Sequence, residues 1–445
     1  MRDNPLAMEI TFYNLLRFAA PTIAMLLFRA LYTIVDGFFV ARYVGSAQLA
    51  AISIFYPVLS VMFALSSMLA LGGSVVVSRQ LGEGDEPAAR GNFSLVICIG
   101  ALVGGAAFVL GTMFVNPILY FMGAKPDILA YCREYMLSLM PFMPMLVLLM
   151  IFQAFFVASG RPLLGMWCNV AGGVANIILD YVFVALMGMG LFGAGCATGI
   201  GYSLPAVLGF AFFAGRGRGA LYLVKPSFRH KSRILAEICV NGSPEFISNI
   251  SEALTTLLFN ITVIKYFGGH GAAALIIILY VQFFFAALFY GYSDGVVPLV
   301  SYNYGNRNTA KLRRLLSCSL KFVIASSAFL FALSMLLPEM IISAFASSET
   351  GVFKIAAKGL SLFSFAFVVG GTNLFIACFF SALSNGRAGA VISILRSLVL
   401  PSLLIITLPL VWGAAAVWLA VPIAETIVAL VSGLMLRVYK KRYNY

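Results

Sequence analysis

Uninterrupted apolar segments of twenty or more residues recur along the whole of this 445-residue chain. A segment of that length can cross the hydrocarbon core of a bilayer as an α-helix. The strands of a membrane barrel would instead alternate apolar and polar residues over about ten positions, and these segments show no such alternation. The chain is therefore predicted to be an all-α polytopic membrane protein. Twelve transmembrane helices are predicted, near residues 18–41, 50–76, 92–116, 128–156, 163–187, 191–214, 236–263, 271–300, 315–337, 358–384, 389–411 and 413–437.

The basic residues fall mainly on one side of the predicted bilayer. With the N-terminus placed in the cytoplasm, 20 of the 29 Lys and Arg residues lie in inner loops or tails, and six lie in outer loops. Because Lys and Arg accumulate on the cytoplasmic side, both termini are predicted to be cytoplasmic. The formal net charge of +13 then reflects topology and an anionic inner leaflet rather than nucleic-acid binding. The expected location is the bacterial cytoplasmic membrane.

The two halves of the chain resemble each other at a constant offset of 223 residues. Pro21 falls on Pro244, and both are expected to let their helices bend. Small residues repeat in the same register: Gly45 on Gly268, Gly72 on Gly295, Ser78 on Ser301 and Gly82 on Gly305. Six helices per half return the chain to its starting side, so both halves insert the same way up.

We therefore predict two six-helix lobes related by a pseudo-twofold axis along the membrane normal. The N-terminal lobe is expected at 1–214, a basic cytoplasmic linker at 215–233, and the C-terminal lobe at 234–445. A cleft between two such lobes can open to either side in turn, which is typical of a transporter.

Six of the sixteen acidic residues lie at membrane depth: Asp36, Asp180, Glu245, Glu252, Asp294 and Glu425. An ionisable group at that depth costs at least a few kcal/mol, so a functional role is the default interpretation. The alternative is an interfacial carboxylate near a helix end. For Asp294 and Glu425 this alternative takes the form of snorkelling toward the inner interface. Glu245 is predicted near the first turn of its helix, where a carboxylate suits the helix dipole.

Asp36 and Asp180 are predicted to lie at the same depth in the first lobe. Each follows an arginine at the inner face by 19 residues, which corresponds to about 28 Å along a helix. Asn176 precedes Asp180 by four residues and therefore shares its helical face. Two carboxylates and an amide oxygen at one level predict a site for a hard cation or a proton. The second half has no such site, because the position equivalent to Asp36 is Phe259.

Arg29 lies two helical turns before Asp36, and the offset of 223 places it on Glu252. Three hypotheses follow for its partner. Arg29 pairs with Glu252 across the lobes in one conformational state, it reaches along its own helix to Asp36, or it binds backbone carbonyls. Tyr32, between Arg29 and Asp36, is the best candidate for an aromatic cleft wall that contacts flat cations.

Several motifs of other protein classes are absent from the sequence. No GxxxxGK[ST] occurs, so the chain does not hydrolyse ATP through a P-loop. No HExxH occurs, and the seven cysteines contain no CxxC pair, so zinc sites and a disulfide framework are not indicated. We expect no enzyme activity and no cofactor apart from a coupling ion.

Motifs in both halves resemble those of a known family. They are Pro21 with LYTIVDGFFV, then GGSVVVSRQLGEGD, ASGRP, NIILD, GAGCATGIG, SPEF, PLVSYNYGNRN and ALSNGRAGAVISILRS. In order and spacing they resemble the multidrug and toxic compound extrusion (MATE) transporters, in particular the bacterial branch that includes MepA-type pumps. The resemblance covers essentially the whole chain.

This resemblance implies twelve helices in two lobes and cation-coupled export of organic, often cationic, compounds. It also implies a first-lobe site for Na⁺ or H⁺ at Asp36, Asn176, Asp180 and Thr198. Glu252 matches a helix 7 glutamate of another branch, whereas Asn373 stands near the place of the helix 10 aspartate that accompanies it there. Arg29 departs from the family pattern, in which an uncharged polar residue is expected.

We therefore expect a secondary active multidrug exporter that antiports H⁺ or Na⁺ against small organic compounds by alternating access. We expect it to act as a monomer. Roles in the substrate cleft or in coupling are predicted for Arg29, Tyr32, Glu252, Asn373 and Asp294. The alternative within transport is a flippase for lipid-linked saccharides. A membrane enzyme or receptor is the rival from a different class, and the duplicated plan disfavours it.

Overall fold

The computed structural model describes residues 5–43, 46–215, 219–225, 231–343 and 351–445. The side chains at 33–43, 46, 47, 49, 50 and 231 lie outside this description. Every regular element in the described ranges is helical. The first half contains α1 (Phe12–Tyr43), α2 (Ser46–Glu83), α3 (Glu86–Met113), α4 (Val115–Phe121), α5 (Leu129–Leu139), α6 (Met143–Ala158), α7 (Pro162–Asp180), the π-helix η3 (Tyr181–Leu186) and α8 (Gly190–Ala214).

The second half begins with the long helix α9, which contains two predicted spans. Its elements are α9 (Lys231–Gly305), α10 (Thr309–Leu336), α11 (Pro338–Ser343), α12 (Gly351–Phe363), α13 (Phe365–Ala382), α14 (Gly386–Ile394), the π-helix η4 (Leu395–Val399), α15 (Leu400–Trp412), the 3₁₀-helix η5 (Ala414–Leu419) and α16 (Ala420–Tyr443). Two shorter 3₁₀-helices, η1 (Pro5–Ala7) and η2 (Met140–Phe142), lie in the first half.

The number of membrane spans follows from one break in α9. Within the described residues, 11 helices are long and apolar enough to cross a bilayer, and one of them is the 74-residue run Ser232–Gly305. At 1.5 Å per residue this run would be about 110 Å long, several times the thickness of a bilayer. Gly268 interrupts it with φ 62° and ψ −154°, a backbone conformation that only glycine adopts readily. Counting the run as two spans gives the predicted twelve.

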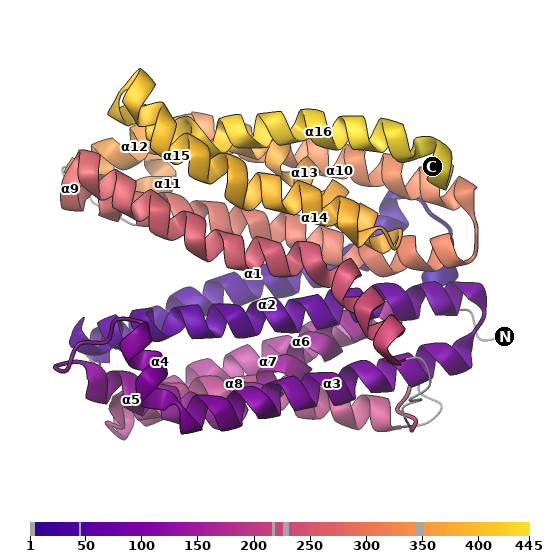
Figure 1. Cartoon of the computed structure of the whole chain (residues 1–445), viewed down its shortest axis with the longest axis horizontal. Helices are drawn as coiled ribbons and strands as arrows, with labels where there is room; N and C mark the ends of the chain where they lie inside the picture. The colour runs from indigo at the N-terminus through magenta and orange to yellow at the C-terminus, as the bar shows by residue number, and fades with distance from the viewer. Residues whose placement is uncertain (1–4, 44–45, 216–218, 226–230, 344–350) are drawn as a thin grey trace.

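The two halves form two lobes that meet at one end of the molecule. Figure 1 shows the ribbons of α1–α8 and of α9–α16 converging at the end where the N- and C-termini lie, and separating toward the opposite end. We call these the termini end and the far end. Helix α9 turns back at the far end, so both of its arms run toward the termini end (Figure 1).

Two contacts between the lobes are related to each other by the offset of 223 residues. A Cβ added to Gly82 of α2 would lie 2.0 Å from the carbonyl oxygen of Tyr302, and one added to Gly305 of α9 would lie 2.1 Å from that of Arg79. Gly82 corresponds to Gly305 and Tyr302 corresponds to Arg79 at the offset of 223, so the two contacts are equivalent with the halves exchanged. Such reciprocal contacts are what a two-fold axis produces, so the pseudo-twofold relation predicted from the sequence is visible in the packing.

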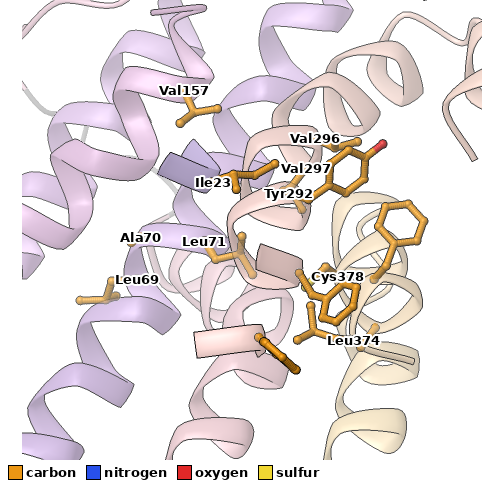
Figure 2. Packing of buried hydrophobic residues seen from close by; sticks show 14 of the residues in the cluster. Ile23, Leu69, Ala70, Leu71, Val157, Tyr292, Val296, Val297, Leu374 and Cys378 are labelled. Carbon is orange, nitrogen blue, oxygen red and sulfur yellow. The ribbon is translucent and has the colours of Figure 1, made fainter. Parts of the chain in front are cut away.

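Small residues also bring α1 against the second arm of α9. A Cβ at Gly291 would lie 2.6 Å from the Cα of Ile23, and a Cβ at Gly295 would lie 3.0 Å from the Cα of Ala19. Figure 2 shows this seam, with Ile23 beside the stretch of α9 that carries Tyr292 and Val296. The seam is closely packed, because Gly291 and Gly295 let the backbone of α9 approach that of α1.

Polar contacts close the termini end. Arg79 of α2 forms an ion pair with Glu237 of α9, and its Nη1 donates a hydrogen bond to Ser384 Oγ at 3.0 Å. We call Arg79, Glu237 and Ser384 the termini-end latch, because the arginine belongs to the first lobe and its partners to the second. On another side, Lys311 Nζ donates to the carbonyl oxygens of Ala7 (2.6 Å) and Met8 (3.0 Å) in the N-terminal segment.

Candidate functional site

The predicted first-lobe site is built on α7. Asn176 and Asp180 lie one helical turn apart and are buried, with exposed fractions of 3% and 0%. Asn176 packs against α8, since a Cβ at Gly201 would lie 2.9 Å from its own Cβ. The Nδ2 of Asn176 has no hydrogen-bond partner among the described residues. A buried amide donor without a partner costs about 1–3 kcal/mol and is rare in folded proteins.

Helix α1 passes directly beside this part of α7. A Cβ at Gly173 would lie 2.6 Å from a ring carbon of Phe28 and 3.0 Å from one of Tyr32, so both aromatic rings of α1 pack on Gly173. Asp36 lies on α1 one turn beyond Tyr32, and its side chain lies outside the described residues. The structure thus packs α1 against α7 at Gly173, two helical turns before Asp180, and the common depth of Asp36 and Asp180 stays a prediction.

Thr198 is the fourth member of the predicted first-lobe set. It is half-buried on α8, and its Oγ1 donates to the carbonyl oxygen of Ala194, one turn earlier in the same helix, at 3.0 Å. The Thr198 hydroxyl therefore has a partner within its own helix in this state. A role for it at the site stays a prediction.

Each lobe contains a π-helical segment next to a buried charge. In the first lobe η3 begins directly after Asp180, and in the second lobe η4 contains Arg396. π-Helical turns are rare and occur often at functional sites. The sequence did not predict them, because neither segment contains glycine or proline and the hydrogen-bond register of a helix depends on its tertiary packing.

The second lobe holds a buried polar network centred on Glu425. Arg396 Nε donates to Glu425 Oε1 at 2.8 Å, and Asn373 Nδ2 donates to Glu425 Oε2 and to its backbone oxygen, both at 2.8 Å. Glu425 is 4% exposed and Asn373 is fully buried. Snorkelling toward the interface is therefore wrong for Glu425. The sequence predicted a cleft role for Asn373. It did not predict that Arg396 binds the same carboxylate, that of Glu425.

Glu245 and Asp294 lie on the two arms of α9. Because α9 begins at Lys231, Glu245 lies 14 residues inside the helix, and its predicted place in the first turn is wrong. Cys378 Sγ donates to Glu245 Oε1 at 3.6 Å. Asp294 is half-buried and lies near Arg29 of the first lobe.

Arg29 lies at the seam between the lobes. Its Nη1 is 3.7 Å from Met150 Sδ in α6. Its neighbour Ala30 is fully buried in a small cluster with Ala287 and Tyr290 of α9. The ion pairs among the described residues do not include one between Arg29 and Glu252. The predicted pairing of these two residues stays a hypothesis for another conformational state.

Tyr56 and Glu252 come from opposite lobes. Tyr56 belongs to α2 and is 59% exposed, and Glu252 of α9 is also exposed. Tyr56 nevertheless interacts electrostatically with both Glu252 and Arg29. Pro21 and Pro244 lie inside α1 and α9, and both helices continue through them.

Twelve spans in two pseudo-symmetric lobes, with buried ionisable groups beside the seam, define a polytopic membrane transporter. The MatE family model matches residues 21–182 and 244–406, which together make up most of the chain. The chain belongs to the MatE family. The two matches begin at Pro21 and Pro244, the same pair that the internal repeat aligns.

Individual proteins resemble this chain over nearly its full length. It is 26% identical over 438 residues to the multidrug export protein MepA of Staphylococcus saprophyticus subsp. saprophyticus, covering 97% of this chain and 94% of that protein. Its fold matches a crystal structure of MATE in complex with MaL6 with a TM-score of 0.94 at 20% identity, covering 100% and 99% of the two chains. The outward-facing conformation of a multidrug resistance MATE family transporter of the MOP superfamily matches with a TM-score of 0.93 at 21% identity and the same coverage.

Proposed function

We propose that this chain is a secondary active multidrug exporter that exchanges H⁺ or Na⁺ for small organic compounds, often cationic and amphipathic. Membership of the MatE family and the similarity to MepA multidrug export proteins support the class. The observation that carries the coupling mechanism is the buried pair Asn176 and Asp180 on the face of α7 that α1 approaches. The flippase alternative is not favoured, because the ionisable residues at membrane depth are mainly acids and the relatives are multidrug export proteins.

The termini end is the cytoplasmic end in this proposal, and the far end faces outward. The bias of Lys and Arg toward the loops at the termini end supports this orientation. The close glycine contacts and the termini-end latch then close the cytoplasmic side, so the structure corresponds to a state open to the outside. Residues 1–214 and 234–445 move as two bodies, and one chain forms the transport unit.

The first lobe binds the coupling ion. Asp36 and Asp180 take up H⁺ or Na⁺ from the outside, with Asn176 and Thr198 as additional oxygen ligands when the ion is Na⁺. Neutralising these carboxylates removes a charge that is costly to bury, which permits α1 to bend at Pro21 and favours release of the substrate. Reorientation of the lobes then releases the ion into the cytoplasm.

Substitution of Asp36 tests this assignment. Asp36→Asn keeps the size of the side chain but cannot exchange a proton or neutralise a cation. We expect cells that express it to lose drug resistance and efflux while the protein reaches the membrane in normal amount. Asp127→Asn, the same change in an exposed loop, serves as the matched control. Full efflux by the Asp36 variant would contradict the assignment of Asp36 to the coupling-ion site.

A further inference from the structure

Residues 5–10 bridge the two lobes at the termini end, and we call them the N-terminal strap. They precede α1 of the first lobe, and Pro5 packs on the turn between α6 and α7, since a Cβ at Gly160 would lie 2.5 Å from Pro5 Cβ. On the second lobe, Lys311 of α10 donates from Nζ to the carbonyl oxygens of Ala7 at 2.6 Å and Met8 at 3.0 Å. The strap therefore joins the same two lobes as the termini-end latch, through different residues.

Two apolar side chains anchor the strap. Leu6 is fully buried and Ile10 is 2% exposed, and both belong to the main hydrophobic core. The 3₁₀-helix η1 within the strap also packs against α9 of the second lobe. The positions that correspond to Leu6 and Ile10 at the offset of 223 are Arg229 and Arg233. The second repeat therefore does not encode these apolar anchors, and the strap is an addition to the duplicated scaffold.

Lys311 lies in the first turn of α10, where Asn308 Oδ1 accepts from its backbone N at 3.0 Å. A positive side chain is disfavoured near a helix N-terminus, so the helix itself does not explain this lysine. Its two hydrogen bonds to the strap are charge-assisted and therefore of the stronger kind. Glu9 and Arg314 also approach each other, at 4.0 Å, but their side chains are 75% and 66% exposed, so this pair contributes little.

The strap is fixed to the first turn of α1. Asn14 Nδ2 donates to the carbonyl oxygen of Glu9 at 3.1 Å, and Thr11 Oγ1 accepts from the backbone N of Asn14 at 3.1 Å. Release of the strap is therefore linked to movement of this part of α1.

We propose that the N-terminal strap is a conformational device that binds the second lobe only while the termini end is closed and leaves Lys311 whenever that end opens. The proposal rests on the proposed function for the movement of the two lobes. A segment that binds one of two states shifts the equilibrium toward that state. In the proposed orientation, the strap thus favours the conformation that is open to the outside.

Removal of the lysine contacts tests whether the strap holds the termini end closed. K311M keeps a long side chain that cannot donate, and K440M, the same change at an exposed lysine of α16, is the matched control. Both are made in an R79Q background, where the latch lacks its ion pair. Distances between spin labels at the exposed residues Pro87 and Arg387 report opening in the detergent-solubilised full chain.

We expect K311M to raise the ratio of open to closed molecules about tenfold or more, because hydrogen bonds from a charged donor are among the stronger ones. K440M is expected to leave the ratio of the R79Q protein unchanged. Equal distance distributions in K311M/R79Q and R79Q would overturn the proposal and reduce the strap to a passive packing element.

A second measurement follows the strap itself and keeps Lys311, so it also applies if K311M does not fold. In L6C, a water-soluble thiol reagent reaches the buried position only after the strap has left its place, and mass spectrometry of the peptide distinguishes it from the native cysteines. We expect the modification rate to rise in L6C/R79Q by the same factor as the open population that the spin labels report. A rate that does not change with R79Q would overturn the proposal.

Both measurements are made without substrate and without an ion gradient. Joint changes in strap release and lobe opening support the proposal even if the chain transports no organic compound, a result that would contradict the proposed function instead.

Discussion

The unsatisfied amide of Asn176 is the sharpest sign of a ligand site at the scale of single residues. Its donor is buried without a protein partner among the described residues, beside the fully buried Asp180. An amide that served only packing would cost stability here, and an apolar residue of similar size would replace it. We therefore interpret Asn176 as a residue kept for what it binds.

Substitution of Asn176 separates binding from stability. Asn176→Ala is expected to raise the ion activity needed for half-maximal efflux several-fold, without lowering the unfolding temperature by more than a loss of packing explains. Efflux rates measured against sodium concentration and against pH check this. Asn169→Ala is the control, because the Asn169 amide donates to Gly165 O within α7 at 2.9 Å. Equal effects of the two substitutions would contradict a special role for Asn176.

The sequence predicted residues whose partners share a helix face and missed those whose partners come from other helices. Asn176 and Asp180 are four residues apart, so helical periodicity alone placed them together. Glu425 was predicted only as a membrane-depth acid, because its partners Arg396 and Asn373 lie 29 and 52 residues away on other helices. Glu245 was misplaced because the sequence does not show that α9 begins as early as Lys231.

Glycines determine how closely the helices of the two lobes approach. Gly82 and Gly305 each lie against a carbonyl of the other lobe at distances that exclude a side chain. The repeat at offset 223 identified both positions, but the sequence could not show that they contact the opposite lobe. The π-helices η3 and η4 were equally beyond prediction, since their hydrogen-bond register depends on tertiary packing.

A single methyl group at Gly82 tests the helix contact. Gly82→Ala would place Cβ 2.0 Å from the Tyr302 carbonyl oxygen, so the lobes must separate at the termini end. We expect the closed termini end to be destabilised by about 1–3 kcal/mol, the usual cost of overpacking. Hydrogen exchange in α2 and in the last turns of α9 should accelerate. Gly105→Ala in α3, where a Cβ meets no atom within 4 Å, is the control, and equal exchange in both variants would contradict the contact.

At the scale of the whole molecule, the contacts between the two lobes are only partly symmetric. The glycine contacts obey the pseudo-twofold axis, whereas the equivalents of Arg79 and Glu237 in the other half are Tyr302 and Asn14. The ion pair therefore closes only one side of the axis. The twelve spans and the two lobes were predictable from the sequence, but the closed end was not, because it depends on which conformation is the more stable.

Charge exchange across the latch tests whether it holds the termini end closed. Arg79→Glu is expected to open that end, because it places two carboxylates together, and Arg79→Glu with Glu237→Arg should close it again. Distances between spin labels at the exposed residues Pro87 and Ala310 report the opening. Arg90→Glu is the control, since Arg90 pairs with Glu86 on its own helix. A double exchange that stays as open as the single one would exclude the latch.

The most direct measurement is efflux of a fluorescent organic cation from proteoliposomes under separately imposed sodium and pH gradients, compared between the wild type and Asp180→Asn. We predict that one of the two gradients drives efflux by the wild type and that neither drives it in the variant, although the variant still binds the cation. Gradient-driven efflux of normal rate in Asp180→Asn would contradict the claim that the first lobe exchanges the coupling ion.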